Sequence, residues 1–208
     1  MTAPVRRSPI ARMHAELGAS FESEGGWEIA ASYGDDAGER SALAGTVALV
    51  DVTPRGKIDL RGRIDRAIGA GGGTLCARVA DDWALLLTGP GDEEPLLGTV
   101  EAAAGPGAMV TDATHLFAGF AVGGPEVHEV LARVTSWDPS PLAAGSAAGA
   151  PIADVPAVVL RREPSPTLME VFVGSESARY VWEVLLDAVR RLGGRPAGWR
   201  ALRAEGWR

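Results

Sequence analysis

Two carboxylates in the 208-residue sequence stand where a charge is costly, and an acidic cluster opens a predicted helix. Glu170 lies inside the apolar run 168–173, and a charge in such a strand must be paired or bound to a ligand. Asp51 follows an apolar run, where its carboxylate either braces the next turn by accepting backbone N–H bonds or belongs to a site. Residues 92–94 are Asp, Glu and Glu. These side chains are the first candidates for chemistry.

Other common catalytic signatures are absent from the sequence. It contains no Walker loop, no HExxH motif, no CxxC pair and no nucleophile elbow. His14, His115 and His128 form no pair at metal-ligand spacing on one helix, so we expect no metal site. The glycine-rich stretch 69–73 precedes a strand rather than a helix, which indicates a loop and not a phosphate cradle.

Charge and composition narrow the partners and the compartment. The formal net charge is −7, which argues against a nucleic acid or an anionic membrane surface as the main partner. No apolar run approaches the length that spans a bilayer, and no apolar segment follows Arg6 and Arg7, so neither a membrane helix nor a signal peptide is predicted. The single cysteine, Cys76, fits a reducing compartment, and we expect a cytoplasmic protein.

Strand pairs that alternate with helices would position the candidate residues. Residues 47–62 predict a hairpin with its turn at 53–56, and residues 74–88 predict a second hairpin. Strong helical spacing follows Ser175. Because the order is not a strict strand–helix–strand repetition, an α+β fold is favoured.

The domain organisation follows from two βαβ-like passes, near residues 74–122 and 155–189. They predict two ferredoxin-like halves that share one core. We therefore expect a single domain over residues 1–208, with approximate halves at 1–122 and 123–208.

An ordered set of short motifs resembles the glycine cleavage T-protein (aminomethyltransferase) family. The set begins with Asp51-Val-Thr and the stretch from Lys57 to Gly62, and Gly124-Pro125 follows in family order. Near the end stand Met-Glu170-Val-Phe-Val and Leu-Arg203-Ala-Glu-Gly. The resemblance implies the paired α+β architecture of the T-protein folate-binding region and tetrahydrofolate as the cofactor.

The resemblance also implies roles for individual residues. Glu170 matches a family glutamate that touches the pterin ring of tetrahydrofolate, and a carboxylate can accept two hydrogen bonds from such a guanidine-like edge. Arg203 loosely matches an arginine near the same pocket, and its structural alternative is a salt bridge with Glu205 or Glu170. With Asp51, these residues form the expected cofactor-binding set.

The sequence departs from the family in several places, and two of them bear on catalysis and assembly. The family aspartate on the helix after the second hairpin aligns at about Pro95, which offers neither charge nor N–H. Asp92, Glu93 and Glu94 are the neighbouring carboxylates that could substitute for it in catalysis. The sequence also stops before the family's C-terminal barrel domain, and this shortened form is similar to the gamma subunit of heterotetrameric sarcosine oxidase.

Three functions remain open from the sequence. The first is a small subunit-like member of the aminomethyltransferase and sarcosine oxidase gamma family, which assists a larger amine-oxidising flavoprotein complex in tetrahydrofolate-linked one-carbon metabolism. The second is a compact tetrahydrofolate-dependent methyl or aminomethyl transferase that acts on a small amine. The third is a folate-independent scaffold or a repurposed enzyme on the same fold. A subunit should expose an apolar patch, for which Trp199 and Trp207 are the expected residues.

Overall fold

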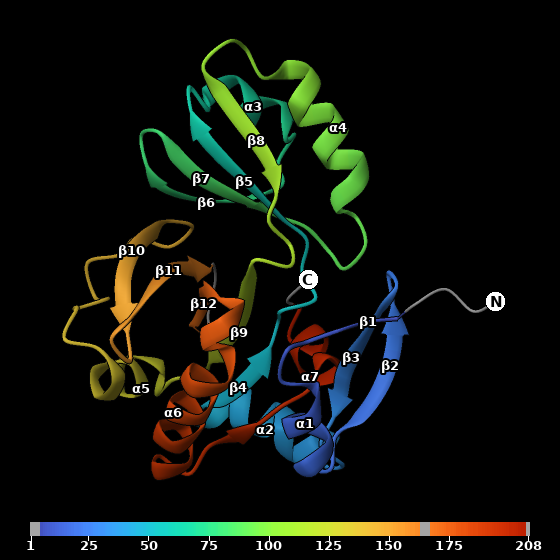
Figure 1. Cartoon of the computed structure of the whole chain (residues 1–208). Coiled ribbons are helices and arrows are strands. Elements are labelled where there is room, and N and C mark those ends of the chain that lie inside the picture. The colour runs from blue at the N-terminus through green and yellow to red at the C-terminus, as the bar shows by residue number, and fades with distance from the viewer. Residues whose placement is uncertain (1–4, 163–166, 207–208) are drawn as a thin grey trace.

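Three β-sheets with helices around them make up the computed structural model, which describes residues 5–162 and 167–206 (Figure 1). The largest sheet has six strands in the order β10-β11-β12-β9-β4-β13. A four-stranded sheet in the order β6-β7-β5-β8 lies at the top of the view. A three-stranded sheet in the order β1-β3-β2 lies at the lower right.

The elements have the following bounds. The strands are β1 (Arg6–Arg7), β2 (Ser20–Glu24), β3 (Trp27–Ser32), β4 (Ala48–Asp51), β5 (Lys57–Gly62), β6 (Leu75–Ala80), β7 (Trp83–Leu87), β8 (Ala108–Asp112), β9 (Phe117–Gly123), β10 (Ala147–Ile152), β11 (Val155–Arg162), β12 (Leu168–Gly174) and β13 (Arg195–Pro196). The helices are α1 (Ala11–Glu16), α2 (Asp36–Gly45), α3 (Asp65–Ala70), α4 (Glu93–Ala103), α5 (Val127–Val134), the 3-10 turn η1 (Ser175–Ser177), α6 (Ala178–Arg191) and α7 (Trp199–Ala204).

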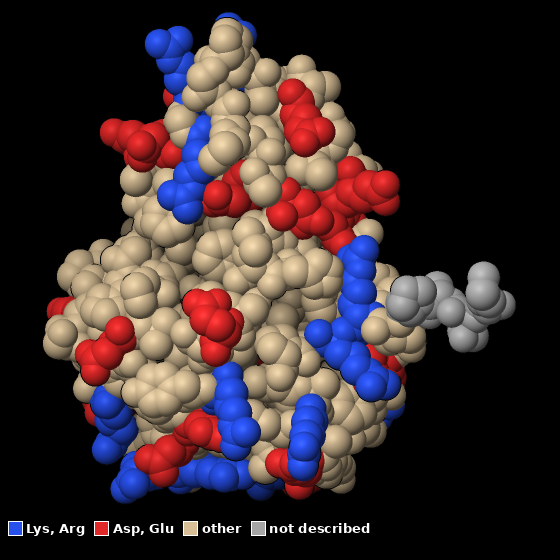
Figure 2. Space-filling view, viewed as in Figure 1, with Lys and Arg blue, Asp and Glu red and all other residues tan. Residues whose placement is uncertain are grey.

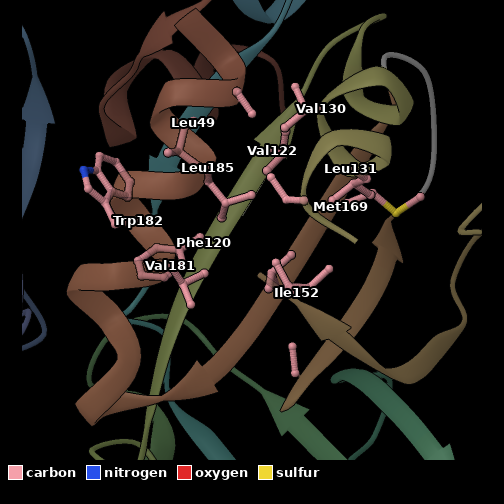
Figure 3. Packing of buried hydrophobic residues seen from close by; sticks show 14 of the residues in the cluster. Leu49, Phe120, Val122, Val130, Leu131, Ile152, Met169, Val181, Trp182 and Leu185 are labelled. Carbon is pink, nitrogen blue, oxygen red and sulfur yellow. The ribbon is translucent and has the colours of Figure 1, made fainter. Parts of the chain in front are cut away.

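The six-stranded sheet is buried on both faces. Leu49 of β4 packs in the cluster with α5 and α6, whereas its neighbour Val50 packs with Leu43 of α2 and Trp199 of α7. Figure 3 shows the first cluster, with Leu185 of α6 between the helix and strand β9. Because strand side chains alternate between faces and both faces are covered, such strands read as continuous apolar runs in the sequence.

The hairpin predicted over residues 47–62 is wrong, although both of its strands exist. Strand β4 pairs with β9 and β13 in the six-stranded sheet, whereas β5 pairs with β7 and β8 in the four-stranded sheet. Residues 52–56 therefore carry the chain from one sheet to the other, and residues 113–116 carry it back. The second predicted hairpin is confirmed, since β6 and β7 pair antiparallel.

The predicted α+β class is confirmed, and the described residues contain no closed barrel. Strands β4 and β12, from opposite ends of the chain, both pair with β9 in one sheet. In residues 5–162 and 167–206, no helix has the length and apolarity to cross a membrane.

Two backbones meet closely where the β2–β3 turn approaches the loop before α4. A Cβ atom on Gly25, whose φ is +53°, would lie 1.8 Å from the carbonyl oxygen of Pro90. The neighbouring Gly26 also has a positive φ, +78°, but a Cβ there would meet nothing within 4 Å. Glycine at position 25 thus allows the three-stranded sheet to approach the loop that follows β7.

We expect Gly25→Ala to destabilise the fold more than Gly26→Ala. Both substitutions place a side chain at positive φ, which costs roughly 1–2 kcal/mol, but only the first also forces two backbones apart. Urea unfolding of both variants measures the difference. Equal losses of unfolding free energy would show that the approach at residue 25 does not constrain the fold.

Candidate functional site

A pocket of about 560 Å³ lies between the three-stranded sheet, the four-stranded sheet, the β4–β5 connection and helix α7. We call it the Trp199 pocket. It draws on the end of β2, the β4–β5 connection, the loop after β7 and helix α7. Its polar and aromatic lining consists of Glu24, Arg55, Thr88, Asp92, Trp199 and Arg203. Its volume lies in the usual range for small-molecule sites, roughly 300–1,000 Å³.

A buried ion pair stands at one wall of this pocket. Arg55 is 2% exposed and places Nη2 3.1 Å from Oε1 of Glu170, which is 0% exposed. Nη1 of Arg162 donates to the same oxygen at 2.7 Å. Burial lowers the pKa of Arg55, and the charge of Glu170 opposes that shift. Of the two alternatives predicted for Glu170, a partner charge or a bound ligand, the structure shows partner charges.

Part of this ion pair remains without hydrogen bonds. Among the described residues, Nε and Nη2 of Arg55 and Oε2 of Glu170 are buried and have no hydrogen-bond partner, so Nη2 contacts Glu170 as an ion pair alone. Buried polar atoms in native proteins nearly always find partners. Of the pair, only Arg55 lines the pocket, so its guanidinium is the group that a ligand would meet there.

An aromatic face with two cations forms the second feature of the pocket. The guanidinium carbons of Arg55 and Arg203 lie 5.7 and 5.2 Å from the ring centroid of Trp199. The indole N–H of Trp199 donates to the backbone oxygen of Asp51 at 2.8 Å. Trp199 is only 2% exposed, so the expectation that it forms an exposed patch is wrong, and Trp207 lies outside the described residues.

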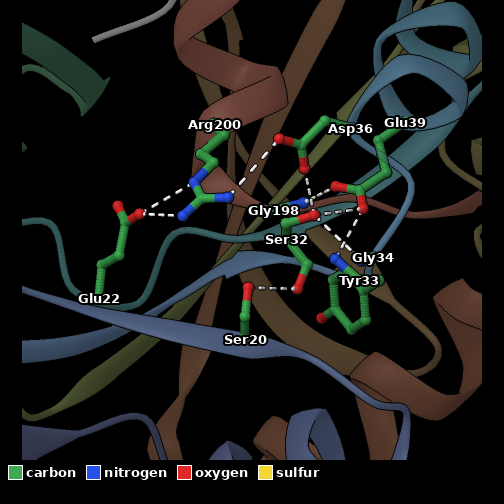
Figure 4. Close-up of polar contacts among 9 residues, drawn as sticks. All are labelled: Ser20, Glu22, Ser32, Tyr33, Gly34, Asp36, Glu39, Gly198 and Arg200. Carbon is green, nitrogen blue, oxygen red and sulfur yellow. Dashed lines mark hydrogen bonds and ion pairs between the residues drawn. The ribbon is translucent and has the colours of Figure 1, made fainter.

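Buried Glu39 positions helix α7 and thus Trp199. Its Oε2 accepts from the backbone N–H of Gly198, the residue before the helix, at 2.8 Å. Its Oε1 accepts from the Ser32 hydroxyl at 3.0 Å and from the N–H of Tyr33 at 2.6 Å. Figure 4 shows this carboxylate between the end of β3 and the start of α7. One α2 side chain therefore connects three elements behind the pocket.

Asp51 is committed to a buried network and does not line the pocket. Its Oδ1 accepts from the N–H of Thr53 at 2.9 Å, which is the predicted brace, and its Oδ2 lies 2.7 Å from Nε2 of His14. Burial pushes the pKa of Asp51 up, but contacts with His14, Ser8 and Thr53 outweigh it and hold the pKa below its ordinary value. The other ring nitrogen of His14 lies 2.7 Å from the Tyr33 hydroxyl. Burial raises the pKa of that phenol well above its ordinary value.

Comparison with known proteins shows the family of this chain. The GCVT N-terminal domain family matches residues 71–206. The chain belongs to this family. It is 31% identical to an aminomethyltransferase of Mycobacterium bovis over 220 residues, which cover 91% of this chain and 59% of the relative. An aminomethyltransferase of Saccharopolyspora erythraea is 28% identical over 232 residues, covering 95% and 62%. The chain thus spans about three-fifths of the length of these curated relatives.

Solved structures show the same fold. The glycine cleavage system aminomethyltransferase T of Bartonella henselae superposes with a TM-score of 0.79 at 18% identity, covering 95% of this chain and 60% of that chain. A chain of the heterotetrameric sarcosine oxidase of Corynebacterium sp. U-96 gives a TM-score of 0.66 at 19% identity, covering 90% and 96%. The family expected from the sequence motifs is confirmed.

The acidic cluster of this GCVT-family domain divides into three different environments. Asp92 is exposed, lines the Trp199 pocket and, among described residues, makes no side-chain hydrogen bond or ion pair. Glu93 is 4% exposed and pairs with Arg6. Glu94 is exposed and is not among the lining residues. Only Asp92 combines access to the pocket with a carboxylate that is not already engaged.

The structure brings only some of the predicted site residues together. Arg203 and Asp92 line the Trp199 pocket, and Glu170 reaches it through Arg55, whereas Asp51 stands apart. The structural alternative proposed for Arg203 is wrong in its partner, because Arg203 pairs with Glu24 of β2. Sequence reasoning missed Arg55, and the available signal was a lone arginine in the turn that follows the buried run of β4.

We expect Glu170→Gln to lower the free energy of unfolding by roughly 3–5 kcal/mol, because it leaves the buried Arg55 charge without its counter-ion. Glu183→Gln is the matched control, since Glu183 pairs with Arg179 on the exposed face of α6 and exposed pairs contribute about 0–1 kcal/mol. Guanidinium unfolding measures both. Similar losses in the two variants would show that the Glu170 pair is not a structural constraint.

Proposed function

We propose that the chain is a subunit-like member of the aminomethyltransferase family that holds a tetrahydrofolate-type ligand in the Trp199 pocket and assists a larger amine-oxidising flavoprotein assembly. One observation carries the proposal. The pocket offers two cations and an aromatic face, while the glutamate expected to bind the pterin is neutralised by two arginines. This combination suits binding better than group transfer.

The residues present fit such a ligand. A reduced folate combines a flat heterocycle with carboxylates at its other end. Trp199 supplies an apolar ring face, Arg55 and Arg203 supply guanidinium groups for carboxylates, and Asp92 supplies an acceptor for ring N–H groups. When bound, tetrahydrofolate supplies the nitrogen that accepts a one-carbon unit. The protein side chains would hold and orient the ligand and exclude water from part of its surface.

Two features support catalysis by a partner rather than by this chain. Proline at position 95, in the first turn of α4, cannot act as an acid, a base or a counter-ion. Buried Glu93 is engaged with Arg6. A bound folate in this pocket would therefore meet few groups that could stabilise charge on its reacting nitrogen.

Two observations support contact with a partner subunit: the exposed apolar side chains and the structural similarity to a chain of a sarcosine oxidase. That matched chain belongs to a heterotetramer. In the described part of this chain, Met109, Leu116 and Tyr180 are each more than half exposed. Figure 2 shows an uncharged area in the middle of the visible face, between charged groups above and below. Exposed apolar groups of this kind suit contact with another protein subunit.

A compact transferase is the second candidate, and Asp92 favours it. Its carboxylate lines the pocket without a partner among the described residues. From that position Asp92 could act as the counter-ion that the family places one turn away. The two functions make opposite predictions for the isolated chain.

Calorimetric titration of the isolated chain with tetrahydrofolate should detect binding, and Arg203→Met should weaken it by roughly 10- to 100-fold. That range corresponds to the loss of one hydrogen bond to a charged group, about 1.5–3 kcal/mol. Arg200→Met is the control, because Arg200 lies on the same helix and pairs with Glu22 but does not line the pocket. Absence of heat with the unmodified chain, or equal weakening by both variants, would contradict ligand binding in this pocket.

The unmodified chain alone should show no turnover of sarcosine, dimethylglycine or an aminomethyl-lipoyl donor with tetrahydrofolate. Pro95→Asp should bring activity above background, since it restores a carboxylate at the family position. Formation of methylenetetrahydrofolate from the aminomethyl-lipoyl donor measures the activity of Pro95→Asp, because that transfer releases ammonia and needs no oxidant. Sarcosine and dimethylglycine would need one, which the isolated chain does not supply. Turnover by the unmodified chain that is lost in Asp92→Asn and kept in the exposed-site control Glu94→Gln would replace the subunit proposal with the transferase.

A further inference from the structure

The only lysine in the sequence is fully buried. Every other residue among the 20 Lys and Arg positions is arginine, yet Lys57 is 0% exposed. Its Nζ donates to three backbone carbonyls: Thr53 at 2.8 Å, Arg55 at 2.8 Å and Thr114 at 3.1 Å. The charge is thus surrounded by carbonyl oxygens rather than paired directly with a carboxylate.

Three converging acceptors require the protonated form of this side chain. An ammonium ion has three N–H donors, whereas a neutral amine has two and a lone pair that would face the third carbonyl. Arginine could not replace it, because a planar guanidinium cannot direct three bonds from one nitrogen. The site therefore explains why lysine occurs here in a chain that otherwise uses arginine.

Lys57 ties together the two segments that connect the sheets. Its Nζ holds residues 53–55 on the outward segment and Thr114 on the return segment. Its backbone N–H also donates to Oγ1 of Thr114 at 3.0 Å, and its carbonyl accepts from the N–H of Ala113 at 2.8 Å. The backbone that Nζ holds at residue 55 carries the Arg55 side chain into the Trp199 pocket.

We propose that Lys57 is a positioning residue of the Trp199 pocket, whose ammonium ion fixes the turn at residues 53–56 and so makes ligand binding at Arg55 depend on the Lys57 proton. The inference rests on the proposed ligand site for its binding readout. The link between the lysine and the turn stands on the hydrogen bonds alone. When Lys57 loses its proton, one carbonyl loses its donor, and the turn that holds Arg55 is fixed less tightly.

Burial of the ammonium ion brings this change near neutral pH. Burial lowers the pKa of Lys57 to about 7. The negative charge of Asp51 opposes the shift, the positive charge of Arg55 adds to it, and Asp112 and Glu93 oppose it. The carbonyl acceptors also favour the ammonium form. The binding-competent form is thus complete below the Lys57 pKa and is lost as the pH rises through it.

A protein with one lysine allows a direct test without a ligand. Selective 15N labelling of the lysine side chain gives a single Nζ signal, and the indole N–H signal of Trp199 is assigned with Trp199→Phe. We expect the Nζ signal to titrate between pH 6 and the alkaline limit of folding, and the Trp199 signal to follow with the same midpoint. A lysine that does not titrate in the folded chain, or a Trp199 signal that ignores the titration, would overturn the inference.

The second arm measures tetrahydrofolate binding against pH. In the unmodified chain the dissociation constant should rise by up to about tenfold per pH unit above the Lys57 midpoint, since only the protonated fraction binds. The isosteric neutral variant Lys57→Met should bind tetrahydrofolate weakly at every pH. The control Arg61→Met, which changes the same strand outside the pocket lining, should keep the pH dependence of the unmodified chain. A flat profile in the unmodified chain overturns the inference. If tetrahydrofolate does not bind at any pH, the proposed function fails and the ligand-free arm decides on Lys57. If Lys57→Met does not fold, the NMR titration and the pH profile of tetrahydrofolate binding, both measured on the unmodified chain, decide.

Discussion

The Glu170 carboxylate, buried in the six-stranded sheet and held by two guanidinium groups, is the interaction on which the site and the fold both depend. Taking an ion out of water costs several kcal/mol, so a buried charge is tolerated only with good partners. Arg55 and Arg162 supply them at 3.1 and 2.7 Å. Because Arg55 belongs to the connection between two sheets, the pair fixes that connection to strand β12. The wall of the pocket is thus set by the same contact that neutralises the core charge.

The same ion pair changes what the family fold can present to a ligand. A glutamate in the corresponding strand can bind the polar edge of a pterin only when its oxygens are available. Here Oε1 is shared by two arginines, and Arg55 rather than Glu170 lines the pocket. The family fold is kept at TM-scores of 0.79 and 0.66, while the charged groups that line the pocket here are Arg55, Arg203, Glu24 and Asp92 and not Glu170. Fold similarity alone does not determine which reaction a site performs.

The sequence predicted the local features of this chain better than its long-range pairings. The apolar run before Asp51 and the alternation after Lys57 correctly indicated strands, because both patterns depend on burial of neighbouring residues. The hairpin assigned to them was wrong, since the turn residues do not reveal that the chain passes to another sheet. Glu170 could be identified as a charge that needs a partner. Its partner Arg55 could not, because no local pattern connects residues so far apart in the sequence.

Exposure of Trp199 was mispredicted for a similar reason. The segment around it is polar, with Arg200 and Arg203 close by, and such a segment is typical of a solvated helix end. Those arginines instead reach back to Glu22 and Glu24 of β2, and the indole enters the space between them and the sheet. Ion pairs on its polar side thus hold the short helix α7 against β2, with its indole buried. The amphipathic pattern of a six-residue helix is too short to show this in advance.

The position of the pocket follows from the way the chain passes between sheets. Glu24, Arg55 and Trp199 come from β2, the β4–β5 connection and α7, so no single element contains a complete site. A ligand bound there contacts all three and favours the arrangement in which they fit it, by as much as its affinities for alternative arrangements differ. Two adjacent cations set that arrangement. Arg55 contacts one carboxylate oxygen of Glu170, and Lys57 directs three donors at backbone carbonyls. The two cations together hold the connection at which the site is assembled.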